Sequence, residues 1–312
     1  MRKPPSRIKA ILLSFLVVII WSSSWILIKI GLRDIPPLTF AALRYFLAFL
    51  FLLPFALNRK VKQQIKDFNK SDWRLIVLMG VTSYFIAQGA QFISLDYLPA
   101  TTLSLLLNLT SILVTISAIF LIKEIPTRLQ VLGVFINLVG IFIFFYPAGF
   151  KGNSFLGFLF AAICLLGNSA GTLIGRRINH LGRVNPIAVT LVAMGIGSIL
   201  MMLTGLLWQG IPKLSSQSLV IILVLALVNT AFTFVLWNYT LQTLTAVESS
   251  IINGTMLVFI TIFSWIFLNE TQNLQGIIGL ILAFIGAIVV NIRFERKAQD
   301  FQGEDNLPAG ML

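Results

Sequence analysis

Ten apolar segments, each close to the length that a membrane crossing requires, constrain most strongly what this chain can fold into. A helix needs about 20 residues to span the hydrocarbon core of a bilayer. With 57% hydrophobic and 11% charged residues, the chain is not an ordinary soluble domain. The segments are too long and too uniform for strands, so the sequence predicts an all-α polytopic membrane protein with ten transmembrane helices. They lie at 8–32, 37–57, 73–95, 99–122, 129–146, 155–176, 186–207, 218–241, 246–268 and 274–292.

The basic residues gather in alternate connections between these segments. Lys and Arg number 23 against 11 Asp and Glu, which gives a net charge of +12. With the N-terminus inside, 18 of the 23 fall in cytoplasmic segments, and only Arg33, Lys151 and Lys213 fall outside. This positive-inside pattern predicts a multi-pass protein of the cytoplasmic membrane, embedded in the lipid bilayer, with both termini cytoplasmic. It also explains the basic charge without a nucleic-acid partner.

The stretch 95–140 recurs in register 146 residues later, without gaps. The identical positions include a serine, a threonine, a glutamate and two glycines. They are Leu95, Leu98, Ala100, Ser104, Thr115, Ile116, Glu124, Gly133 and Gly140, matched by Leu241, Leu244, Ala246, Ser250, Thr261, Ile262, Glu270, Gly279 and Gly286. Because five spans fit inside the offset, the second copy is expected upside down relative to the first. The sequence therefore predicts two inverted five-helix repeats, 1–146 and 147–293, followed by a polar cytoplasmic tail, 294–312. Such repeats are typical of secondary transporters, whose substrate site lies near the bilayer midplane.

The fifth and tenth spans carry small residues at helical spacing. Lipid provides no hydrophobic drive for helix association, and small residues let two backbones approach closely. A structural scaffold or the seam of a possible homodimer is the expected role. The positions are Gly133, Asn137 and Gly140 in one span and Gly279, Ala283 and Gly286 in the other.

Polar side chains line one face of several spans. An amide that faced lipid would leave its hydrogen-bonding groups unsatisfied, so these faces are expected to turn inward. They would either line a water-accessible cavity for a small-molecule substrate or bond across helices as packing contacts. With Arg44, the predicted substrate-binding residues are Trp21, Ser24, Tyr84, Gln88, Gln91, Asn108, Asn168, Asn229 and Trp237.

Ionisable groups within the spans are functional candidates by default. Arg44 could bind a substrate carboxylate or phosphate through two parallel hydrogen bonds. It could equally pair with Asp34, Asp96 or Glu270 and serve assembly, and both interpretations stay open here. The candidates for coupling or gating are Glu124, Glu248, Asn253 and Glu270.

The chemistry of an enzyme is missing from the pattern. His180 is the sole histidine and falls in a cytoplasmic loop, so neither a His-based triad nor a metal site is expected. The G-x-x-x-x-G-K-[ST] motif of an ATP site is absent. We therefore predict no catalytic residue, no metal and no cofactor.

Several motifs taken together resemble the EamA family of the drug/metabolite transporter superfamily. The matching motifs are Trp21-Ser-Ser-Ser-Trp25 with Lys29, Pro37 with Arg44, Leu98-Pro-Ala-Thr with Glu124, Gly133 and Gly140, and Leu244-Thr-Ala with Glu270, Gly279 and Gly286. The resemblance covers residues 8 to 292. It implies ten helices in inverted repeats around a central cavity, and transport of small metabolites such as amino acids, often outward. The family usually has glycine where this chain has Ser22, and a mid-span proline near the positions of Ser111 and Leu257. Because that proline is absent here, the hinge of the gating helices is expected at Asn253-Gly254 instead.

The sequence thus favours a secondary transporter, an exporter or permease that moves a small organic metabolite by alternating access. The main alternative is a membrane assembly or interaction protein with a closed polar core. A membrane enzyme acting on lipid lacks the paired carboxylates or histidines that it would need. A passive channel would be separated from a carrier by its lack of saturable, counter-substrate-stimulated flux.

Overall fold

The computed structural model describes residues 5–110, 112–113, 127–146, 154–180, 186–240, 243–244 and 252–291. Within these ranges the chain is helical and contains no strand. The elements are α1 (Arg7–Gly31), α2 (Pro37–Ala56), α3 (Arg59–Lys66), α4 (Lys70–Met79), η1 (Gly80–Ala87), α5 (Gln88–Tyr97), α6 (Ala100–Leu107), α8 (Arg128–Phe145), α9 (Ser154–His180), α10 (Pro186–Gln209), α11 (Ser216–Ala226), η2 (Leu227–Phe232), α12 (Thr233–Thr240), α14 (Met256–Leu268) and α15 (Leu274–Asn291).

Six helices in the described part of the chain are long and apolar enough to cross a membrane. They are Arg7–Gly31, Pro37–Ala56, Lys70–Tyr97, Phe155–Gly175, Ile187–Gln209 and Ser216–Trp237. Two of these are continuous rods in which a π-helical segment joins two α-helices, namely α4–η1–α5 and α11–η2–α12. Shorter apolar helices lie within the fifth, ninth and tenth predicted spans, and α6 begins the fourth.

Local sequence explains how the connection between α2 and α4 folds. The sequence predicts only a polar break there, and the structure contains the short helix α3. The Asn58 side chain caps it by accepting a hydrogen bond from the Lys60 amide at 3.0 Å. Asn69 and Asp72 then start α4 with a capping box, in which each side chain accepts from the other residue's amide. Both caps satisfy amides that the first helical turn leaves without partners.

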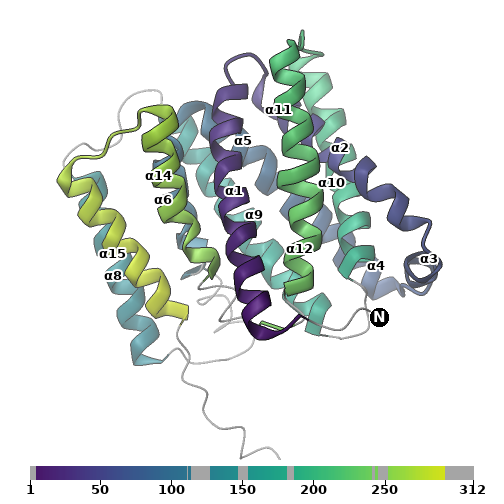
Figure 1. Ribbon diagram of the computed structural model, residues 1–312, viewed down its shortest axis with the longest axis horizontal. Helices are drawn as coiled ribbons and strands as arrows, with labels where there is room; N and C mark the ends of the chain where they lie inside the picture. The colour runs from purple at the N-terminus through teal and green to yellow at the C-terminus, as the bar shows by residue number, and fades with distance from the viewer. Residues whose placement is uncertain are drawn as a thin grey trace, which may run out of the picture.

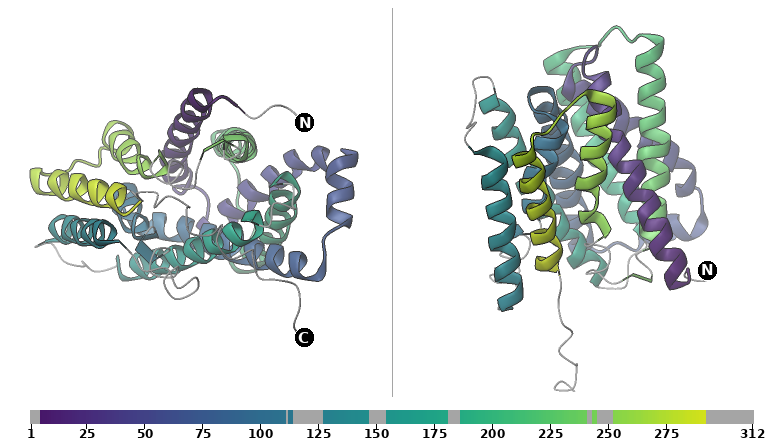
Figure 2. Two further views of the ribbon diagram at one scale, coloured as in Figure 1. Left: turned by 90° about the horizontal axis from the view of Figure 1, so that it is seen from below. Right: turned by 60° about the vertical axis from the view of Figure 1, so that its left-hand side comes forward.

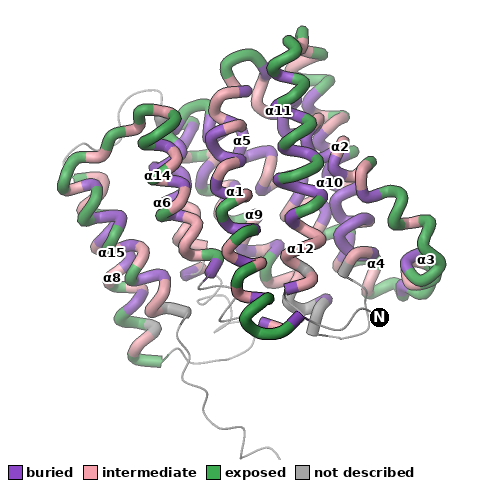
Figure 3. The backbone as a smooth tube through the Cα atoms, viewed as in Figure 1, coloured by how far each residue is buried: buried purple, intermediate pink, exposed green. Residues whose placement is uncertain are grey.

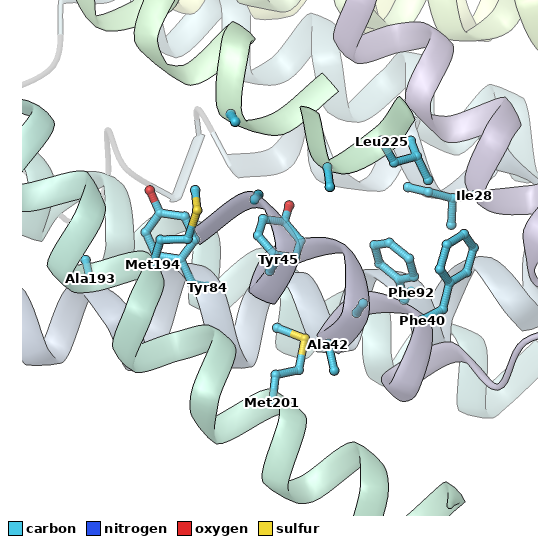
Figure 4. Packing of buried hydrophobic residues seen from close by; sticks show 14 of the residues in the cluster. Ile28, Phe40, Ala42, Tyr45, Tyr84, Phe92, Ala193, Met194, Met201 and Leu225 are labelled. Carbon is cyan, nitrogen blue, oxygen red and sulfur yellow. The ribbon is translucent and has the colours of Figure 1, made fainter. Parts of the chain in front are cut away.

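The long helices stand side by side, and their shared core lies between α1, α2, α5, α10 and α11 (Figures 1 and 2). Phe40 of α2 meets Phe92 of α5 edge to face, with ring centroids 5.1 Å apart. Figure 4 shows this pair near Ile28 and Leu225, while Met194 lies by Tyr84 at the other side of the view. This packing holds α2 against both rods and so fixes the positions of the polar groups described below.

The outer surfaces of the helices are apolar. On α11 the exposed residues include Leu219, Val220 and Leu223, and on α8 they include Phe135 and Phe142. Figure 3 shows α11 and α15 with exposed outer faces along their length. Such surfaces suit lipid acyl chains rather than water, and with the six long helices they identify a multi-pass membrane protein.

The two glycine faces pack against each other within the chain, as α8 against α15. A Cβ atom added to Gly140 would lie 2.7 Å from the Gly279 carbonyl oxygen, and one added to Gly279 would lie 2.7 Å from the Gly140 carbonyl oxygen. Asn137 adds a hydrogen bond from its Nδ2 to the Ala283 carbonyl oxygen at 2.6 Å. The seam is therefore a close contact between the two halves of one chain, which is a scaffold role.

Candidate functional site

Two π-helical segments, one in each half of the sequence, carry the polar centre of the molecule. A shift of 146 residues carries residues 80–87, which form η1, onto 226–233, and η2 occupies Leu227–Phe232. Widened turns of this kind are frequent at functional sites because they displace side chains and free carbonyl groups. In η2 the Thr230 hydroxyl donates to the Leu225 carbonyl oxygen, five residues back, at 2.8 Å.

The residues around these segments form a connected group, which we call the central polar cluster. Its members are Trp21, Arg44, Tyr45, Tyr84, Gln88, Asn229, Thr230 and Thr233.

Arg44 of α2 is the charged member of the cluster, and its side chain is only 4% exposed. Its Nε donates to the Thr230 hydroxyl at 2.9 Å, and its Nη2 lies 3.5 Å from the Asn229 carbonyl oxygen. The guanidinium carbon stands 5.2 Å from the Tyr45 ring centroid and 5.9 Å from that of Phe92, within cation–π range. Among the described residues Arg44 therefore has no carboxylate partner, in contrast to the pairing that the sequence left open.

Tyr45 and Tyr84 extend the cluster from α2 to η1. The Tyr45 hydroxyl donates to Gln88 Oε1 at 2.6 Å, and the rings of Tyr45 and Tyr84 meet edge to face at 6.2 Å. Thr190 of α10 forms a hydrogen bond with the Tyr84 side chain. Figure 4 shows both tyrosines on neighbouring helices inside the apolar core. A buried phenol needs such polar partners, because an unsatisfied hydroxyl in an apolar environment is unfavourable.

Aromatic side chains close the cluster on the side of α1 and α12. Trp21 Nε1 donates to the Thr233 hydroxyl at 2.8 Å. The Trp21 ring also contacts Phe234 at 5.5 Å and Trp237 at 5.3 Å between centroids. Phe234 reaches Tyr84 at 6.0 Å, so the aromatic contacts run from α1 across α12 to η1. The group thus combines aromatic walls with hydrogen-bonding groups.

Asn229 is tied to α1 through its side-chain amide. Its Nδ2 donates to the Ile20 carbonyl oxygen at 2.5 Å and lies 3.2 Å from the Ser23 hydroxyl. With 2% of its surface exposed, it joins η2 to the first helix. This is the packing contact that an interhelical amide can supply.

The other predicted site residues lie at the edges of the cluster or apart from it. Ser24 is buried and donates to the Trp21 carbonyl oxygen of its own helix. Gln91 is buried on α5, and Asn108 is half-buried at the end of α6. Asn168 donates to Cys164 Sγ on its own helix at 3.4 Å. Asn253 is exposed. Glu124 and Glu248 lie outside the described residues.

The turn between α5 and α6 is held by two opposite charges. Lys29 of α1 donates from its Nζ to the carbonyl oxygens of Leu98, at 2.9 Å, and Leu95, at the end of α5. Glu270 accepts from the amides of Ala100 and Thr101 at 2.9 and 3.1 Å, and from the Thr101 hydroxyl at 3.0 Å. Each charge meets the helix end whose partial charge it opposes. Glu270 thereby ties the second half of the sequence to the start of α6.

Two contacts in the cluster have counterparts at positions shifted by 146 residues. Arg44–Thr230 joins α2 to η2, and the equivalent pair, Thr190–Tyr84, joins α10 to η1. The offset also relates Trp21 to Gly167 and Thr233 to Ala87. These two equivalents lie close together as well, because a Cβ added to Gly167 would be 3.1 Å from the Ala87 Cβ. The same positions therefore meet in both halves with different side chains.

Sequence reasoning missed Tyr45 and Thr230. Both follow directly after a residue that was selected, Arg44 and Asn229. Regular α-helical spacing places Asn229, Thr233 and Trp237 on one face and Thr230 on another, and the π-helical turn changes that spacing locally. For Tyr45 the available signal was its phenol within a span, next to a buried charge. In the described part of the chain, no group of three or more His, Cys, Asp or Glu could hold a metal ion.

Comparisons with known proteins show what this chain is similar to. A family model described as the EamA-like transporter family matches residues 8–146 and 155–292. The uncharacterized transporter YoaV of Bacillus subtilis is 26% identical over 292 residues, which are 90% of this chain and 96% of that protein. A probable amino-acid metabolite efflux pump of Salmonella typhimurium is 24% identical over 234 residues, 73% and 74% of the two chains. A solved crystal structure that is 20% identical aligns with a TM-score of 0.67 over 90% of this chain and 97% of its own, which concerns the fold alone.

Proposed function

The chain belongs to the EamA-like transporter family, and from this premise we propose that it is a secondary transporter that moves a small organic metabolite across the cytoplasmic membrane by alternating access. The proposed solute is an amino acid or a related compound. The name of the Salmonella typhimurium relative, a probable amino-acid metabolite efflux pump, supports this class and an outward direction.

The central polar cluster is the observation that carries the proposal. A buried cation and several hydrogen-bonding groups are unfavourable inside a membrane protein unless they serve a function or satisfy one another. Arg44 meets only neutral acceptors among the described residues. The cluster also lies where α2 and η1, from the first half, meet η2 and α12, from the second half. A solute bound there would contact both halves, as alternating access requires.

We propose that the chain has ten spanning helices in two inverted halves, with both termini cytoplasmic. Three observations support this arrangement. The π-helical segments share the offset of the sequence repeat. The paired contacts Arg44–Thr230 and Thr190–Tyr84 share it as well. Equivalent glycines, Gly133 with Gly140 and Gly279 with Gly286, lie on the two helices that pack as α8 and α15.

A closed polar core without transport is the second candidate. Asn229 favours it, because its amide is already satisfied by the Ile20 carbonyl and the Ser23 hydroxyl. The Trp21 indole is likewise satisfied by Thr233. In that case these side chains would stabilise the fold, and replacing them would unfold the protein rather than stop flux.

The experiment that tests the proposal is counterflow in proteoliposomes. Vesicles containing the purified protein are preloaded with one unlabelled compound from a panel of amino acids, sugars, nucleosides and organic phosphates. The same compound is then supplied outside as a tracer. A carrier gives a transient accumulation of tracer above equilibrium, whereas a channel gives simple equilibration. We expect accumulation for at least one amino acid or related compound, and none in preloaded vesicles that contain no protein.

Two variants separate transport from folding. Trp21→Ala removes an aromatic wall and should abolish accumulation while the protein stays monodisperse and helical. Thr82→Val is the matched control, because its exposed hydroxyl bonds only to the Leu78 carbonyl of its own helix. It should keep full accumulation. Absence of accumulation for the whole panel in folded wild-type protein, with Trp21→Ala unfolded, would favour the closed core and refute the transporter.

A further inference from the structure

The charge balance of the central polar cluster identifies the chemical class of the solute. Arg44 is the one cationic member, and the cluster as described contains no acidic side chain. A guanidinium in an apolar interior is strongly unfavourable without a counter-anion, and buried charges in proteins are normally paired. Within the described part of the chain, the site therefore lacks one negative charge.

The hydrogen bonds of Arg44 leave part of its donor capacity unused. A guanidinium has five N–H groups. Nε has a well-formed bond to Thr230, and the Nη2 contact with the Asn229 carbonyl is long at 3.5 Å. Within the described residues Nη1 has no hydrogen-bond acceptor. The edge of the guanidinium that holds Nη1 and Nη2 matches the spacing of the two oxygens of a carboxylate.

We propose that Arg44 binds a carboxylate of the transported solute, and that the solute carries a single net negative charge at this end. This inference rests on the proposed transport function. One carboxylate neutralises Arg44, whereas a phosphate dianion would replace a buried excess positive charge with a buried negative one. The rings of Tyr45 and Phe92 hold the guanidinium from its flanks, so the fork is set in place before the solute arrives.

The proposal separates Arg44 from a purely structural role. If Arg44 only tied α2 to η2, its bond to Thr230 would be its whole contribution. Removing either partner would then lower stability by a similar amount and leave the choice of solute unchanged. If Arg44 binds the carboxylate, removing its charge changes the selectivity for solutes as well as the stability.

The first test uses the wild-type protein and measures thermal stabilisation in lipid nanodiscs. The probes are the amino acids and four simple monocarboxylates (acetate, pyruvate, lactate and benzoate), each compared with its own amide at matched ionic strength. A compound that binds the folded state raises the melting temperature by mass action. We expect at least one carboxylate to bind about 10- to 100-fold more tightly than its amide, as expected for a charge-assisted hydrogen-bonded pair. Equal stabilisation by every acid and its amide would overturn the proposal.

The second test uses variants and the same pairs of compounds. Arg44→Gln should lose the preference for the carboxylate over the amide, and Thr82→Val, whose hydroxyl bonds to the Leu78 carbonyl outside the cluster, should keep it. Arg44→Lys, which retains the charge without the planar fork, should keep a reduced preference. An Arg44→Gln protein that folds and still prefers the carboxylate would refute the proposal. If the Arg44 variants do not fold, the wild-type comparison decides alone.

Counterflow distinguishes failure of this inference from failure of the transport function. Accumulation of a neutral or cationic solute, with no advantage for carboxylates, would leave the transporter in place and remove the role of Arg44. Absence of accumulation for every compound would instead refute transport itself. Binding of a carboxylate without any flux would leave Arg44 as an anion site in a protein that does not carry its ligand.

Discussion

The contact between Glu270 and the start of α6 leads to a quantitative prediction. The Glu270 carboxylate accepts three hydrogen bonds, two from backbone amides of the first turn of α6 and one from the Thr101 hydroxyl. Removing an N-terminal cap lowers stability by about 0.5–2 kcal/mol, and removing a charge next to a helix N-terminus lowers it by about 0.3–1 kcal/mol. Because the side chain is only half-buried, water can replace part of what is lost. We expect Glu270→Ala to lower the free energy of unfolding by about 1–3 kcal/mol.

A second substitution separates the charge from the hydrogen bonds. Glu270→Gln keeps one acceptor oxygen for the two amides and loses the negative charge. Its expected loss is about 0.5–1 kcal/mol, smaller than that of the alanine variant. The adjacent Thr271 is exposed and its side chain is not part of the cap, so Thr271→Ala serves as a control with a change below about 0.5 kcal/mol.

The measurement is unfolding of the purified variants in lipid, followed by tryptophan fluorescence and compared at one temperature. The reasoning requires the order alanine, glutamine, control, from most to least destabilised. If the free energy of unfolding of Glu270→Ala lies within about 0.5 kcal/mol of the wild-type value, the Glu270 contact does not stabilise α6 in the lipid-embedded protein. If Glu270→Gln loses as much as Glu270→Ala, the negative charge, and not the acceptor oxygen that glutamine keeps, accounts for the contact.

Three further predictions concern the seam and the cluster. Gly140→Ala should lower the melting temperature by an amount equivalent to about 1–3 kcal/mol, because the new methyl group meets the α15 backbone. Gly254→Ala is the control and should be neutral, since nothing lies within 4 Å of its Cβ position. Equal melting temperatures for the two variants would contradict close packing of α8 against α15. Tyr45→Phe should lower the free energy of unfolding by about 0.5–1.5 kcal/mol through loss of its 2.6 Å hydrogen bond, and an unchanged value would show that the bond is not formed. Trp21→Phe keeps the aromatic packing and loses the hydrogen bond to Thr233, so it should lower the free energy of unfolding by about 1 kcal/mol and keep the near-UV circular dichroism of the folded protein. Loss of that signal would show that Trp21 is needed for the fold.

Hydropathy alone located the helices, because a membrane span needs a length and a composition but no particular partner. The six long helices lie where the apolar segments predicted them. The short helix α3 was not predicted, since its eight residues are polar and depend on the Asn58 cap. The choice of partner for Arg44 was also beyond the sequence. Three acids were compatible with its depth in the membrane, and the packing of α2 against η2 placed a threonine there instead.

Helical periodicity predicted the polar faces only where the helix stays regular. On α5, Gln88 accepts the hydrogen bond of Tyr45 in the cluster, and Gln91, three residues further along the helix, is buried. In η2 the π-helical turn brings Thr230 to Arg44, and a wheel drawn at 3.6 residues per turn separates it from Asn229. The exposed position of Asn253 shows a related limit, because a single polar residue has no periodicity to indicate which way it faces.

The paired contacts explain how two equivalent helix crossings can form a site that contains a single charged side chain. The offset relates Arg44 to Thr190 and Thr230 to Tyr84, so the same two helix crossings exist in both halves. Only one crossing contains a charge, and it faces no described carboxylate. If both halves carried arginine here, two buried cations would repel each other across the centre, and if neither did, a carboxylate would gain nothing by leaving water. In the proposed transporter, the geometry that lets the halves exchange roles would therefore be kept in the backbone, and solute selectivity would depend on the positions where the two copies differ.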